Sequence, residues 1–146
     1  MLARVLFVIA TIFFAGIALA AKPAIFSDRN GAIRGYDPVA YFTQRAPVRG
    51  SNEFRHEWRG ATWYFASEEN RARFAADPES YAPKYGGYCA YGVALGSAPE
   101  IDPKAWSIVD GKLYLNYNLP TRALWEKDIP GYIRKADANW PAVLTR

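Results

Sequence analysis

Two side chains of types that bind metals or carry out nucleophilic chemistry each occur once in this sequence. Cys89 is the sole cysteine and His56 the sole histidine among 146 residues. A thiolate and an imidazole suit Cu(I) or Zn(II), and the softer thiolate favours copper. The pair therefore predicts a site for copper, zinc or another thiophilic metal. One chain would supply two ligands, and a homodimer would supply four.

The same pair supports a thiol-dependent enzyme, with Cys89 as nucleophile and His56 as base. No C-x-x-C pair is present for redox exchange, and no Asn or Asp adjoins His56 to orient its ring. Both residues also have plain structural interpretations, because a free cysteine is among the most buried residue types and alternation places the histidine between aromatic residues. A non-enzymatic role is therefore favoured.

Residues 85–92 surround the cysteine with glycines and tyrosines. Glycine permits close backbone approach, but a phosphate loop would need a lysine or a G-x-G-x-x-G pattern, so nucleotide binding is excluded. Aromatic side chains predict either a groove for a protein or small ligand or a well-filled core; they are Tyr85, Tyr88 and Tyr91, with Trp58, Trp63 and Trp106. An interaction module without metal is therefore the alternative to the metal site.

The first twenty residues have the pattern of a cleaved signal peptide. Arg4 precedes an apolar stretch over residues 5–18, and Ala-Leu-Ala allows cleavage after Ala20. This predicts a periplasmic or secreted protein with no stable membrane span after cleavage. The alternative is an uncleaved anchor, because the apolar run to Ala21 reaches the short end of the roughly 17–25 residues that cross a bilayer.

Composition and charge exclude several classes of protein. The chain is 51% hydrophobic and 16% aromatic, which is typical of a globular domain. The net charge is +4, and the basic residues are scattered among acidic ones. They do not form the continuous basic surface that nucleic-acid binding requires. A single cysteine allows no internal disulfide, so the fold depends on packing. Met1 leaves with the signal peptide, which excludes a thioether-rich copper site.

Alternating polarity predicts two β-hairpins. Residues 53–58 alternate, with His56 on the apolar face, and residues 62–65 return after a turn at Arg59-Gly60. The second hairpin joins residues 106–109 to residues 113–117 through Asp110-Gly111, with Leu113, Leu115 and Tyr117 expected on one face.

Helix signals fall between and after these hairpins. The expected helices cover residues 39–43 after Asp37-Pro38, residues 67–74 with Ser67 as cap, a turn at 78–81, and a helical tail over 121–138 broken at Pro130-Gly131. Asp102-Pro103 predicts one more short turn. These elements predict a small single α+β domain with antiparallel hairpins and short helices. Residues 1–20 are the signal peptide, 21–34 a lead-in segment and 35–146 the domain.

Part of this pattern resembles the YHS domain, a small module associated with metal binding. The resemblance covers residues 53–81, in which a hairpin is followed by a helix and by Asp-Pro-Glu-Ser-Tyr, and it includes Tyr36-Asp37-Pro38-Val39 upstream. Residues 85–92 and the tail over 125–141 look like exported bacterial members of this group. The resemblance thus implies a YHS-like fold.

The chain departs from the family where metal ligands are concerned. Metal-binding members usually carry cysteines at positions where this sequence has Ala40 or its neighbours, Ala66 and Asn70, and only His56 matches. The sequence therefore favours an exported, non-enzymatic YHS-like domain that binds copper or another thiophilic metal. An interaction module with an aromatic groove, binding a protein or ligand, comes second. A thiol-dependent enzyme comes third.

Overall fold

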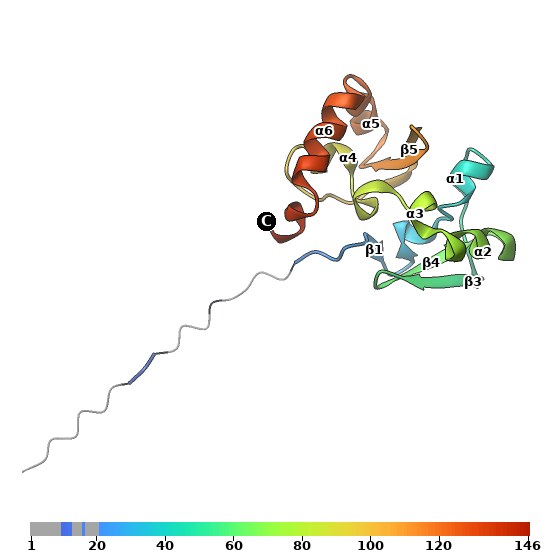
Figure 1. The fold of residues 1–146 in the computed structure, drawn as a ribbon, viewed down its shortest axis with the longest axis horizontal. Helices are drawn as coiled ribbons and strands as arrows, with labels where there is room; N and C mark the ends of the chain where they lie inside the picture. Colours follow the sequence, from blue (N-terminus) through green and yellow to red (C-terminus); the bar gives the residue numbers. More distant parts are fainter. Residues whose placement is uncertain (1–9, 13–15, 17–20) are drawn as a thin grey trace, which may run out of the picture.

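The computed structural model describes residues 10–12, 16 and 21–146, and its helices and strands, which begin at Ser27, form a mixed α+β fold (Figure 1). Most of the expected signal peptide, residues 1–9, 13–15 and 17–20, lies outside the described residues. Within the described part of the chain, no helix has the length and apolar character needed to cross a membrane.

The described strands form three antiparallel pairs, as an α+β fold with hairpins requires. Their bounds are β1 Ser27–Asp28, β2 Gly31–Ala32, β3 Ser51–Trp58, β4 Ala61–Phe65, β5 Asp102–Val109 and β6 Lys112–Asn116. The α-helices are α1 Ala40–Thr43, α2 Glu68–Ala76, α3 Pro78–Tyr81, α4 Ala90–Ala94, α5 Leu119–Glu126 and α6 Ile129–Asn139. Short 3-10 turns are η1 Ile33–Gly35, η2 Lys84–Gly87 and η3 Ala142–Thr145. The predicted fold class is confirmed.

Local signals account for both longer hairpins. In each, a residue followed by glycine turns the chain with two positive φ angles, 49° and 75° at Arg59-Gly60 and 50° and 73° at Asp110-Gly111. Such a turn has the twist that antiparallel strands need. His56 pairs with Trp63 across the first hairpin and is half-buried, while Arg55 on the opposite face is exposed. The predicted alternation is confirmed.

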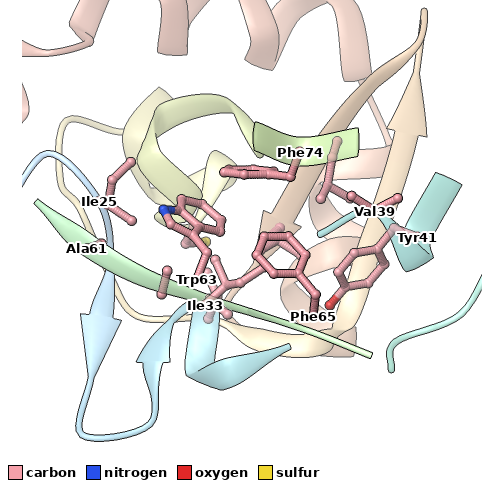
Figure 2. Close-up of a cluster of buried hydrophobic side chains, with 13 residues drawn as sticks. Ile25, Ile33, Val39, Tyr41, Ala61, Trp63, Phe65 and Phe74 are labelled. Carbon is pink, nitrogen blue, oxygen red and sulfur yellow. The ribbon is translucent and has the colours of Figure 1, made fainter. Parts of the chain in front are cut away.

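The first core cluster centres on Phe74 of α2, which is fully buried. Figure 2 shows Trp63 and Phe65 of β4 beside it, and the ring centroids lie 5.0 Å and 5.2 Å from that of Phe74. Ser67 caps α2 as predicted, its Oγ accepting the Asn70 N–H at 3.1 Å. Burying such an aromatic side chain contributes roughly 1.5–3 kcal/mol, so this cluster holds the hairpin against α2.

Asp37 ties α1 to the start of α2. One carboxylate oxygen accepts the N–H groups of Val39 and Ala40 at 2.8 Å and 3.2 Å. The other accepts the Ala66 N–H at 2.9 Å and the Asn70 side-chain amide at 2.8 Å. Asp37 therefore caps α1 as predicted, and it also joins two helices that lie far apart in the sequence.

The second core cluster lies among α4, α5, α6 and β6, on the other side of the molecule from the first hairpin (Figure 1). Trp125 of α5 is fully buried and packs on Tyr114 of β6 with a centroid distance of 5.3 Å. This strand is buried on both faces from Leu113 to Asn116, because Leu113 and Leu115 belong to the first core cluster and Tyr114 to the second.

Three sequence-based expectations in this half are wrong. Asp102-Pro103 begins β5 instead of a separate turn, because Asp102 pairs with Asn116 of β6. Tyr117 follows β6 and is 46% exposed, so it does not share the buried face of Leu113 and Leu115. The helical tail breaks at 127–128, and Pro130 occupies the first turn of α6, where a missing N–H is harmless.

The lead-in segment packs into the domain. Ile25 and Ile33 belong to the first core cluster, and the Phe26 N–H donates to the Gly86 carbonyl at 2.8 Å. Gly86 has φ 62°, and a Cβ there would lie 1.9 Å from the Ala24 carbonyl oxygen. Only glycine allows this approach, which explains one of the glycines in residues 85–92.

Candidate functional site

Cys89 lies at the start of α4 with its sulfur almost fully enclosed. The residue is 1% exposed. Its Sγ accepts the Tyr117 N–H at 3.2 Å and the Gly92 N–H at 3.4 Å. It also lies 3.5 Å from the side-chain oxygen of Asn116, to which the S–H can donate. Short α4, which the sequence did not predict, holds the thiol in this position.

The charge state of the thiol follows from these surroundings. Burial raises the pKa of Cys89 above its ordinary value, and the backbone N–H donors of Gly92, Tyr117 and Tyr91 offset only part of that effect. Since the ordinary value already lies above neutrality, the thiol is protonated at pH 7. A buried, protonated thiol is a poor nucleophile and a poor metal ligand.

His56 occupies a different setting on β3. It is half-buried, and its ring meets the edge of Phe74 at a centroid distance of 6.1 Å. No hydrogen bond or ring contact joins it to Cys89. Among the described residues, no group of three or more His, Cys, Asp or Glu side chains is placed to hold a metal ion.

The surroundings of Cys89 do not favour the metal site predicted from Cys89 and His56. Burial favours the neutral thiol over the thiolate that binds metals, and the sulfur is enclosed by the residues around it. Asn116, the nearest polar side chain, presents its oxygen but is held by the Tyr91 N–H at 3.0 Å. The shared site of Cys89 and His56 stays a prediction, and titration with metal can test it.

The three candidate tyrosines lie in different places. Tyr85 is buried, and its hydroxyl donates to the Asp137 carboxylate at 2.8 Å. Burial, followed by the contact with Asp137, raises the pKa of Tyr85 far above its ordinary value. Tyr88 is also buried and donates to the Pro23 carbonyl. Tyr91 packs its ring against Tyr132.

Only Tyr85 of these three lines a groove with a volume of about 600 Å³. Trp58, at the end of the first hairpin, and Trp140, after α6, supply further aromatic surface. Trp140 also contacts the Tyr85 ring, with centroids 6.1 Å apart. The groove therefore lies where the first hairpin, η2 and the C-terminal segment meet.

Charged side chains also line this groove. Arg59 stacks over the Trp58 ring, 4.4 Å from its centroid, and forms an ion pair with Glu79. Lys84 lies over the Tyr85 ring at 5.7 Å, and Lys112 lines the groove from the start of β6. Together with Asp137, the groove thus carries three basic and two acidic side chains.

Sequence reasoning missed most of these groove residues. Lys84, Lys112 and Asp137 have no fixed spacing and come from three separate elements. Trp140 stood out only as part of the tail that resembles exported bacterial proteins. No motif could have joined them, because the groove exists only once the C-terminal segment packs beside η2.

Comparison with protein families assigns the segment from α1 to Tyr85 to a known family. Residues 39–85 match the family model of the YHS domain. No curated protein and no solved structure matches the chain. The match includes Trp58, Arg59 and Tyr85 but ends before Lys112 and Trp140, so the groove combines family and non-family segments. With α1, the first hairpin, α2 and α3 all inside the match, the chain is a YHS domain-containing protein.

Proposed function

We propose that this chain is an exported, non-enzymatic binding module whose ligand site is the groove lined by Trp58, Tyr85 and Trp140. The supporting observation is that three aromatic side chains from separate segments border one hollow of about 600 Å³. Ligand sites commonly have volumes of about 300–1,000 Å³ and combine aromatic walls with a few polar groups. The groove has that make-up.

The non-enzymatic part of the proposal rests on the cysteine. Cys89 is the one thiol in the chain, and it is 1% exposed and protonated at neutral pH. A nucleophile needs access to its substrate and an adjacent base. No described contact supplies a base to its sulfur.

Binding can be tested with a neutral fluorescent probe, N-phenyl-1-naphthylamine, whose emission rises in apolar surroundings. Ala24 is exposed and borders the groove, so Ala24→Phe should fill part of it and weaken probe binding by roughly tenfold. Ala72→Phe, on the exposed face of α2 and outside the groove, is the matched control. Equal binding by both variants would contradict the proposal.

The same protein can be titrated with Cu(I) and Zn(II), the metals expected from the sequence. Stoichiometric binding that is lost in both Cys89→Ser and His56→Ala would replace the groove proposal with the metal site. Because the sulfur is enclosed and burial favours its protonated form, we expect no tight binding that depends on Cys89.

Export is part of the proposal because residues 1–20 have the pattern of a signal peptide, and the fold is compatible with cleavage there. The Lys22 N–H donates to the Leu144 carbonyl at 2.8 Å, and the Lys22 ammonium donates to the Ala98 carbonyl at 2.8 Å. Cleavage after Ala20 would leave these bonds intact. Intact mass of the protein recovered outside the cytoplasm should therefore correspond to a chain beginning at Ala21, whereas full-length protein in the membrane fraction would indicate an anchor.

A further inference from the structure

The groove has an uneven distribution of unpaired charge. Glu79 is ion-paired with Arg59, and the Asp137 carboxylate accepts the Tyr85 hydroxyl. Lys84 and Lys112 form no ion pair with any described residue. With three basic side chains against two acidic ones, the groove carries an excess of one positive charge and two ammonium groups without an ion-pair partner among the described residues.

The aromatic faces argue against a cationic ligand. An aromatic site for an ammonium group needs open ring faces. Here the Arg59 guanidinium already lies over the Trp58 ring at 4.4 Å, and the Lys84 ammonium lies over the Tyr85 ring at 5.7 Å. A second cation would be repelled by the cations that hold these faces.

The acidic side chains argue against a highly charged anion. Glu79 and Asp137 both border the groove, so a dianion such as a phosphate monoester would be repelled at two places. A monoanion can approach the lysines while keeping its uncharged part against the remaining wall. Carboxylates carry one negative charge at neutral pH.

We propose that the groove binds a small aromatic carboxylate. Its carboxylate is held by Lys84 and Lys112, and its apolar body lies against the aromatic wall that includes Trp140. This inference rests on the proposed function and specifies its ligand class.

Three probes of one shape but different charge test the ligand class: 2-naphthoate, neutral 2-naphthamide and cationic 2-naphthylmethylamine. Their binding to the purified protein can be followed by NMR chemical-shift changes at Lys84, Tyr85 and Trp140. Because each exposed charge pair contributes about 0.2–1 kcal/mol, two lysines should make naphthoate bind roughly fivefold more tightly than naphthamide. The cationic probe should bind most weakly.

A double variant separates the charge effect from the groove itself. Lys84→Gln with Lys112→Gln should bring naphthoate to the affinity of naphthamide and leave naphthamide binding unchanged. Lys104→Gln with Lys127→Gln removes the same charge at exposed positions outside the groove and should keep the preference.

The outcomes distinguish the two proposals. Equal binding of naphthoate and naphthamide, tightest binding of the cation, or a preference that survives the Lys84 and Lys112 substitutions would overturn the carboxylate inference and leave the groove as a binding site. If none of the three probes changed the chemical shifts of the groove residues, both the carboxylate inference and the proposed binding function would be overturned.

Discussion

Two fully buried polar side chains, Asp37 beside α1 and Asn116 at the end of β6, are satisfied to different degrees. The Asp37 carboxylate accepts four hydrogen bonds from N–H donors. The Asn116 side-chain oxygen accepts the Tyr91 N–H and faces the Cys89 thiol, but its Nδ2 has no partner among the described residues.

This difference in hydrogen bonding indicates that Asp37 is a structural clamp, whereas Asn116 makes a less complete contact. A buried carboxylate is tolerated when donors surround it, and those donors then fix the elements that carry them. A buried amide group without a partner carries a penalty of about 1–3 kcal/mol. Asp37 therefore holds the YHS fold together, whereas Asn116 and Cys89 form a centre that the fold stabilises less completely.

Substitution of Asp37 tests this comparison with the largest expected effect. Asp37→Ala would leave buried N–H groups of α1, Ala66 and Asn70 without acceptors, so the free energy of unfolding should fall by about 3–5 kcal/mol. Urea unfolding followed by tryptophan fluorescence measures this change.

Asn70→Ala is the matched control for the clamp. It removes one donor and leaves the carboxylate with three hydrogen bonds, so the loss should be about 1–2 kcal/mol. If the two variants were equally stable, the four bonds to Asp37 would not act as the clamp described.

Tyr41 of α1, close to Asp37, makes the stability of this region depend on alkaline pH. Its buried hydroxyl donates to the Pro103 carbonyl at 2.8 Å. Its pKa is raised far above the ordinary value, mainly by burial and then by nearby Tyr36, Asp102 and Asp37. In the unfolded chain this hydroxyl loses its proton near pH 10, whereas in the folded chain it keeps it. Its contribution to stability is therefore complete below about pH 10 and is lost as the pH rises further.

Tyr41→Phe should flatten this alkaline loss. Above about pH 10, wild-type stability should fall by about 1.4 kcal/mol per pH unit for this group, and the variant should lack that contribution. Urea unfolding at pH 7 and between about pH 10 and 11 gives the comparison. At pH 7 the variant should be slightly less stable because it lacks the bond to Pro103. Equal alkaline slopes would contradict the assignment.

Local signals in the sequence were sufficient for the YHS half of the fold. Ser67 caps α2, Arg59-Gly60 turns the first hairpin, and His56 lies on its half-buried face, because each of these features depends on neighbours in sequence. Asp37 was predicted as a cap for the same reason. Its bonds to Ala66 and Asn70 could not be predicted, since they need α2 to pack beside α1.

The second half depended on contacts between distant segments. Asp102-Pro103 has the pattern of a helix start, but pairing with β6 draws it into a strand. Asn116 meets Cys89 across 27 positions, and the groove brings Lys84 to Lys112 and Trp140. Periodic patterns in a sequence do not reveal contacts between distant segments. The sequence therefore predicted Cys89 and Tyr85 as candidate site residues but could not predict the residues that they contact.

Asn116→Ala provides the smallest and most discriminating change. It leaves the Tyr91 N–H without its acceptor, but it also removes the Nδ2 group that has no partner. These two effects oppose each other, so the free energy of unfolding should fall by only about 1 kcal/mol, well below the effect of Asp37→Ala. Urea unfolding of both variants under one condition measures the ratio. A loss as large as that of Asp37→Ala would mean that Nδ2 has an acceptor in solution, and the two buried centres would then be equally complete.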